Sequence, residues 1–178
     1  MKKKGFTLIE LIVVIAIIGV LAAMLVPAMM GYISKSKIMN SNGAANSVLK
    51  GANIAIVELS NRDYNYSLLD GNITVDAADI VACKDVIMSS VSRDSTNVNE
   101  LRSILYASIY RYFTDVEELD EVSFQISNGE CVGVGVLKGR YPGSAPIAIG
   151  IEDFQQVEET GTWDSDVALD YATGTTTP

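Results

Sequence analysis

The chain has 178 residues, a net charge of −9 and no histidine, and 48% of its residues are hydrophobic. This length accommodates one domain of ordinary size in addition to a long helix. From Gly51 onward, seven Lys or Arg stand against 21 Asp or Glu, which gives this part a net charge of −14. Because such a surface repels phosphate backbones, we expect no direct nucleic-acid site. The absence of histidine also excludes an ordinary Ser-His or Cys-His dyad.

The N-terminus joins a short basic leader to a long apolar run. Lys2, Lys3 and Lys4 precede Gly5, and the run begins at Phe6. It contains one carboxylate, Glu10, and no charge from Leu11 to Ser34. About 20 apolar residues are enough to cross a bilayer as a helix. An acid deep in lipid costs roughly 2.5–3.5 kcal/mol and normally marks function, so Glu10 requires an explanation.

Two simpler interpretations of this segment do not account for Glu10. A secretory signal peptide has an apolar core of about 7–15 residues and then a small-residue cleavage site, and the run here is too long. A plain membrane anchor explains the length and, through the positive-inside rule, the basic leader. It does not explain an acid near the start of the apolar run.

The segment KKKG-FTLIE followed by an apolar helix resembles the prepilins of the type IV pilin family, which includes the pseudopilins. The resemblance covers roughly the first third of the chain. It implies cleavage between Gly5 and Phe6 by a prepilin peptidase, with methylation of the new amino terminus at Phe6. Glu10 becomes the fifth mature residue, an assembly determinant together with Phe6. Gly19 and Pro27 stand where family members place helix-weakening residues.

The resemblance also implies partners and a location. A pilin polymerises with copies of itself, is delivered by an assembly platform with its ATPases, and is held in the membrane by its single N-terminal helix beforehand. We therefore expect the cytoplasmic membrane before assembly and an extracellular pilus on the cell surface afterwards. Three functions remain open: a main or minor pilin, a pseudopilin of a type II secretion system, and a surface-binding anchored protein that does not polymerise.

The helix is predicted to continue beyond the apolar run. After Lys35 and Lys37, apolar residues recur with the i, i+3, i+4, i+7 spacing of an amphipathic helix, at Ala45, Val48, Leu49, Ala52, Ile56 and Leu59. A continuous helix from 6 to 59 would be ~80 Å long. We expect three parts: a leader at 1–5, a membrane or filament-core helix at 6–34, and a globular head at 35–178 that includes the second half of the helix.

The rest of the head is predicted to be an antiparallel sheet preceded by two short helices. One helix starts near Asp76, and the other opens at Asn97 with Glu100 three residues later. Alternating apolar residues on both sides of Asn128 and Gly129 predict a hairpin. Its register stays open, because a strict two-residue turn and a bulge place opposite sets of side chains on the inner face.

Two further strands are predicted from alternating residues at 147–151 and at 167–171. The fold is therefore expected to be α+β: a long N-terminal helix, its apolar half protruding and its amphipathic half packed on an antiparallel sheet of about four strands. The two short helices lie between the helix and the sheet in the chain.

The two cysteines, Cys83 and Cys131, allow two interpretations. Outside the cytoplasm two thiols usually pair, and closing this 48-residue separation would contribute about 4 kcal/mol. We expect Cys83 to bond Cys131; the alternative is two buried free thiols. Many members of the pilin family have a disulfide near the C-terminus, but this pair lies earlier and is wider.

No residue pattern indicates an enzyme, and we expect no cofactor and no metal. Asp164, Asp166 and Asp170 are acidic residues of a kind that could bind calcium, but the remaining spacing of a known calcium loop is missing. A solvated acidic loop is the preferred interpretation.

Overall fold

The computed structural model describes residues 7–175 and divides the chain into two compact units between Ser36 and Lys37. Helix α1 (Leu8–Asn61) confirms the long N-terminal helix, and its assignment runs through Pro27 without a break. Residues 37–175 hold four strands, four further α-helices and three short 3-10 turns among the described residues. The predicted α+β class with an antiparallel four-stranded sheet is confirmed.

Within the second unit, α1 buries one face against the sheet. The predicted stripe is confirmed, with Leu49 only half-buried, and the fully buried positions are Ala45, Val48, Ala52, Ala55, Ile56 and Leu59. Three of these six are alanines, which let backbones approach closely. At Gly51 a Cβ would lie 3.6 Å from the Cα of Ile109. Helix α3 (Val98–Tyr112) therefore packs directly against α1.

The sheet runs in the order β1 (Gly71–Asp76), β2 (Glu121–Ser127), β3 (Glu130–Lys138), β4 (Tyr141–Ala145), with every neighbouring pair antiparallel. The predicted hairpin is β2–β3, and Asn128 and Gly129 both have positive φ, as a type I′ turn requires. A bulge follows the turn: Ile126 pairs with Cys131, but Gln125 pairs with Gly133. The bulge settles the register, so Val134 and Val136 are buried, while Val132 is exposed.

Two α-helices lie between α1 and the hairpin, in the predicted order. The first, α2 (Ala77–Ala82), ends at Cys83, and the chain then continues through a 3-10 turn (Met88–Ser90). Asn97 caps α3 as predicted, with its side chain accepting a hydrogen bond from the Asn99 amide. Glu100 does not close the expected capping box; its carboxylate instead accepts from the Ser95 hydroxyl. Two more 3-10 turns, Tyr66–Leu69 and Thr114–Glu118, connect the elements.

Both strands predicted in the C-terminal third are wrong. Residues 151–160 form helix α4 (Ile151–Thr160), and residues 165–173 form helix α5 (Ser165–Thr173). In α5 the fully buried residues are spaced as on a helix, and they are Ser165, Ala168, Leu169 and Ala172. Asp164 caps the start of α5, and Gly174 ends it in the left-handed conformation. The strand predicted from the alternating residues at 167–171 did not take these two helix-end residues into account.

The actual edge strands β1 and β4 were not predicted, because neither carries a long run of alternating apolar residues. Strand β4 contains Pro142 and Gly143, which sequence patterns assign to turns. Its glycine is needed for packing, since a Cβ at Gly143 would lie 2.2 Å from the backbone of Ser41 in α1. The close approach of α1, rather than the strand propensity of these residues, therefore explains why β4 contains a glycine at this position.

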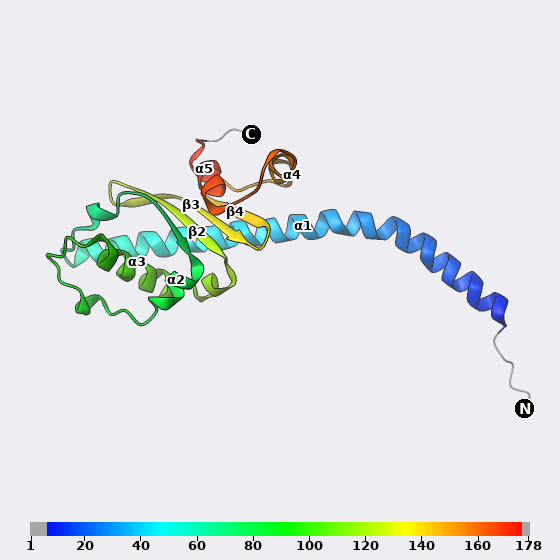
Figure 1. The fold of residues 1–178 in the computed structure, drawn as a ribbon, viewed down its shortest axis with the longest axis horizontal. Helices are drawn as coiled ribbons and strands as arrows, with labels where there is room; N and C mark the ends of the chain where they lie inside the picture. The colour runs from blue at the N-terminus through cyan, green and yellow to red at the C-terminus, as the bar shows by residue number, and fades with distance from the viewer. Residues whose placement is uncertain (1–6, 176–178) are drawn as a thin grey trace, which may run out of the picture. The chain divides into compact units, whose positions relative to one another are not determined.

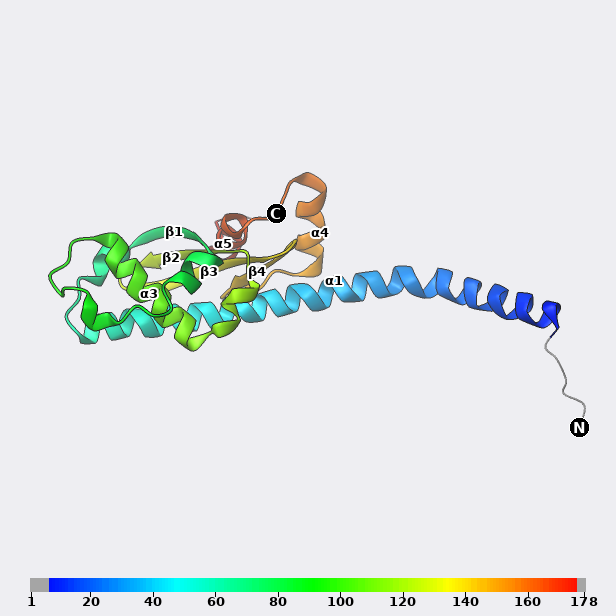
Figure 2. The same cartoon turned by 60° about the horizontal axis from the view of Figure 1, so that its bottom comes forward.

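Helix α5 lies on the face of the sheet opposite α1 (Figures 1 and 2). Gly133 and Gly135 of β3 make room for it: a Cβ at Gly135 would lie 2.1 Å from the carbonyl oxygen of Ser165. A buried hydroxyl network fastens the contact, since Ser123 bonds Ser165 at 2.7 Å and donates to Asp166 at 2.6 Å. The sheet is thus covered by helices on both faces.

Candidate functional site

The first turn of α1 contains the one acid of the apolar run, and the structure places it in a capping box. The backbone amide and the hydroxyl of Thr7 donate to Oε2 of Glu10 at 2.8 and 2.7 Å. The Glu10 amide donates back to the Thr7 hydroxyl at 3.3 Å. Two backbone donors that no helix can satisfy internally are thereby satisfied.

This arrangement gives Glu10 a local role that the sequence analysis missed. The spacing T-x-x-E was visible in the sequence as a helix-start signal. Among the residues that the structure describes, Oε1 of Glu10 receives no hydrogen bond. A carboxylate can accept about four hydrogen bonds, so one oxygen can hold the cap while the other accepts a second donor.

The helix that follows Glu10 exposes its apolar side chains all round. Within residues 7–36 the large hydrophobic side chains are 45–76% exposed, and this segment is long and apolar enough to cross a membrane. In water such a surface is strongly unfavourable, at roughly 25 cal/mol per Å². It therefore requires lipid or other protein surfaces around it.

Gly19 and Pro27 both lie inside α1. Pro27 has no backbone donor, so one hydrogen bond of the helix is missing there. A Cβ at Gly19 would meet no atom within 4 Å among the described residues, so packing within this subunit does not require a glycine. The helix is continuous at both positions, and their role in weakening it stays a prediction.

Gly5 and Phe6, the predicted cleavage and methylation positions, lie outside the described residues. The same holds for the leader at 1–5. Processing at the bond between Gly5 and Phe6 therefore stays a prediction, as does the role of the Phe6 amine.

The predicted Cys83–Cys131 disulfide is not formed in the structure, in which both thiols are free. Cys131 is buried at the bulge of β3, where its thiol donates to the carbonyl of Gly133 at 3.5 Å. Cys83 is half-buried at the end of α2, on a different element. Burial raises the pKa of Cys131 to about 12, and burial, followed by the nearby charge of Asp79, raises the pKa of Cys83. Both thiols are therefore weaker acids than a free cysteine, which lowers the share of the reactive thiolate at neutral pH.

The aspartates weighed as calcium ligands have structural partners instead. Asp164 accepts from the Val167 amide at the start of α5, and Asp166 accepts from the hydroxyls of Thr74 and Ser123. Across the part of the chain that the structure describes, no group of three or more acidic, cysteine or histidine side chains could hold a metal ion.

Comparison with known proteins places the similarity at the N-terminus. Residues 1–26 match the family model described as the prokaryotic N-terminal methylation motif. The chain is 61% identical over 41 residues to a type IV major alpha-pilin of Moraxella bovis, covering 23% of this chain and 26% of that protein. It is 37% identical over 83 residues to a fimbrial protein of Moraxella nonliquefaciens, covering 46% of this chain and 50% of that protein.

A third relative agrees with the first two. The type IV major fimbrial protein FimA of Dichelobacter nodosus is 56% identical over 36 residues, which are 20% of this chain and 23% of that protein. The chain thus spans between about a quarter and half of the length of these curated relatives, and no solved structure matches it. The predicted similarity to type IV pilins is confirmed over the N-terminal helix.

Proposed function

We propose that this chain is a structural subunit of a type IV pilus. The observation that carries the proposal is the start of α1: a methylation motif that opens an exposed apolar segment, in which Glu10 in the first turn is the only charge before Lys35. A membrane anchor alone needs the length and hydrophobicity of this helix but not the acid. A subunit that must leave the membrane and pair with neighbours needs both.

Processing comes first in this proposal. The basic leader stays on the cytoplasmic side, which places the bond between Gly5 and Phe6 at the membrane face, where a prepilin peptidase cuts it and methylates Phe6. The mature subunit then waits in the cytoplasmic membrane with its head outside. Glu10 is already partly compensated there by Thr7, which reduces the cost of holding a carboxylate near lipid.

Assembly moves the apolar helix from lipid into a bundle of the same helices from other subunits. An assembly platform and its ATPases supply the work, and lateral contacts bury the apolar side chains again. In the bundle Oε1 of Glu10 accepts from the cationic amine of Phe6 in a neighbouring subunit, while Oε2 keeps its bonds to Thr7. The product is an extracellular filament in which the subunit acts as a structural protein rather than an enzyme.

The test is whether the chain forms filaments. Cells that express it as their only copy are sheared, and the released surface fraction is analysed by electron microscopy and mass spectrometry. Abundant filaments made of this chain are the expected result. A pseudopilin of a type II secretion system would instead leave the sheared fraction empty and impair secretion when deleted. An anchored surface-binding protein would remain in the membrane as single subunits.

A further inference from the structure

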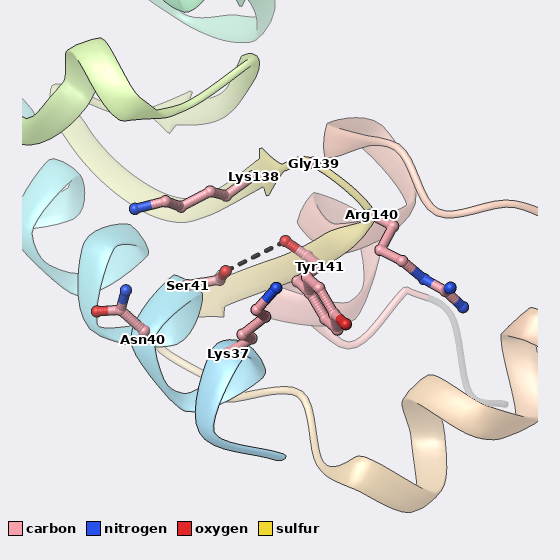
Figure 3. A pocket seen from close by; sticks show the side chains of 7 residues that line it. All are labelled: Lys37, Asn40, Ser41, Lys138, Gly139, Arg140 and Tyr141. Atoms are coloured by element: carbon pink, nitrogen blue, oxygen red, sulfur yellow. Dashed lines mark hydrogen bonds between the residues drawn. The ribbon is translucent and has the colours of Figure 1, made fainter. Parts of the chain in front are cut away.

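A cavity of about 510 Å³ lies between α1 and the β3–β4 turn, wholly inside the second unit. Figure 3 shows its lining, in which three residues are cationic: Lys37, Lys138 and Arg140. The other lining residues are Asn40, Ser41, Gly139 and Tyr141. No step of the function proposed above uses this cavity.

The aromatic wall of the cavity is held rigidly. The ring of Tyr141 stacks on Phe154 with 5.8 Å between centroids, and Phe154 stacks in turn on Trp163 at 6.4 Å. The Ser41 hydroxyl donates to the Tyr141 carbonyl at 3.1 Å, which fixes the backbone of β4 against α1. The wall is thus already formed before any ligand arrives, and ordering it costs no further entropy.

The cations around this wall are available to an anion. The Lys37 ammonium lies 4.8 Å from the centroid of the Tyr141 ring and, among the described residues, is in no ion pair. Lys138 pairs with Glu118 and Arg140 with Glu158, and the two side chains extend to different sides of the cavity (Figure 3). Such exposed pairs contribute only about 0–1 kcal/mol, so both cations can turn toward a stronger anionic partner.

The charge of the cavity contrasts with the rest of the head. Only seven basic residues follow Gly51, against 21 acidic ones, and two of the seven line this cavity together with Lys37. An anion that entered this cavity would therefore meet three basic side chains in an otherwise acidic head.

The position of Lys37 in the chain indicates which anion. Lys37 follows Ile33, the last large exposed hydrophobic residue of the apolar run, by four positions, which is at most about 14 Å of chain. When the apolar run is in a bilayer, this short length of chain keeps Lys37 within reach of the lipid headgroups. Arginine binds phosphate through two parallel hydrogen bonds, and lysines add point charges.

We infer that this cavity binds the phosphate of an anionic membrane lipid while the subunit is held in the membrane, an inference that rests on the membrane-held stage of the proposed function. The bound headgroup fixes the head at the membrane surface, pairs with Lys37 and draws Lys138 and Arg140 from their glutamate partners. Extraction of the subunit during assembly exchanges this lipid for solvent.

Native mass spectrometry of the full chain in dodecyl maltoside micelles tests the inference. The chain is titrated with dioleoylphosphatidylglycerol or dioleoylphosphatidylcholine, and lipid adducts are counted. We expect the anionic lipid to bind at least fivefold more tightly, and K37Q and R140Q each to reduce that affinity about fivefold, as expected for a cation near a lipid surface. Unchanged fluorescence of Trp163, the single tryptophan, shows that the variant heads fold.

The matched control is K35Q. Lys35 is two residues from Lys37 on the same helix, so it faces another direction, and it does not line the cavity. Equal affinity for the two lipids, or a loss in K35Q equal to that in K37Q, would overturn the inference, because the attraction would then be general. Inorganic phosphate that binds as tightly as the anionic lipid would also overturn it, by making free phosphate the ligand.

This result is independent of filament formation. Filaments without a preference for the anionic lipid would refute the lipid site alone. A lipid preference without filaments or leader cleavage would refute the proposed pilus function and leave the site standing.

Discussion

The side-chain amide of Asn53 in α1 forms hydrogen bonds with both backbone groups of one residue of β3, Cys131. Its Oδ1 accepts from the Cys131 amide at 2.9 Å, and its Nδ2 donates to the Cys131 carbonyl at 3.1 Å. This pair joins the helix to the sheet at the bulge, where the strand-to-strand ladder is interrupted. Asn42, earlier in α1, acts in the same way on Ile149: it accepts from the Ile149 amide and donates to the Ile149 carbonyl, and it also accepts from the Ser144 amide.

We predict that Asn53→Ala lowers the free energy of unfolding by about 1–3 kcal/mol, because both backbone groups of Cys131 lose a partner. Urea unfolding of the full chain in micelles, followed by Trp163 fluorescence, measures the change. Asn46→Ala is the control, since among the described residues the Asn46 side chain bonds the carbonyl of Asn42 in its own helix and nothing in the sheet. The two variants should differ clearly; equal stability would contradict a role for the Asn53–Cys131 pair.

Gly135→Ala should destabilise the head by about 1–3 kcal/mol, because the added methyl group would overlap the backbone of α5 at Ser165 and Leu169. The same urea unfolding experiment reports the loss. Gly161→Ala is the matched control, with extended backbone and open space at its Cβ. A Gly135 variant as stable as the Gly161 variant would show that α5 is not seated on β3 as described.

Both thiols should be free, and they should differ in how fast they react. We predict that iodoacetamide at pH 8 modifies Cys83 slowly and leaves Cys131 untouched in the folded chain, while both react in urea. Peptide mass spectrometry without reductant gives the answer, and a recovered Cys83–Cys131 disulfide peptide from exported protein would contradict it.

The raised pKa of Cys131 also predicts the direction in which the stability of the fold changes with pH. Its pKa is about 12 in the folded chain and near 9 when unfolded, so burial of the neutral thiol stabilises the fold below pH 9. That contribution is lost as the pH rises from 9 toward 12. The stability difference between the natural chain and Cys131→Ala should therefore shrink over this range, and a difference independent of pH would refute the assignment.

Gly5→Leu should block removal of the leader, because this position must present its backbone closely to the protease. Intact-mass measurement of surface protein should show 173 residues with a methylated Phe6 for the natural chain. Natural protein that retains the leader in surface filaments would disprove the processing step.

Substitutions at Glu10 separate charge from capping. Glu10→Gln keeps an oxygen to accept from Thr7 but loses the charge, Glu10→Val loses both, and Thr7→Ala removes the hydroxyl cap but keeps the charge. If charge pairing drives assembly, filament yield falls strongly in both Glu10 variants and less in Thr7→Ala, while membrane-held subunit accumulates. The yields are measured in cells without a natural copy. Normal filaments from Glu10→Gln would show that the charge is not the determinant.

Local patterns in the sequence predicted the elements that local interactions stabilise. The apolar run, the stripe from Ala45 to Leu59, the Asn97 cap and the turn at Asn128 and Gly129 each depend on residues within a few positions of one another. Each therefore appears in the structure where it was predicted. The capping box of Thr7 and Glu10 is equally local and was available in the sequence.

The amino-acid sequence by itself determined the N-terminal helix with its acid, the hairpin and the acidic head. Only the tertiary structure decided the hairpin register, the identity of the edge strands, the helical C-terminus and the state of the thiols. The physical reason is distance along the chain: Asn53 meets Cys131 across 78 residues, and Asn42 meets Ser144 across 102. Such contacts leave no period in the sequence, because their geometry exists only after the helix and the sheet have packed.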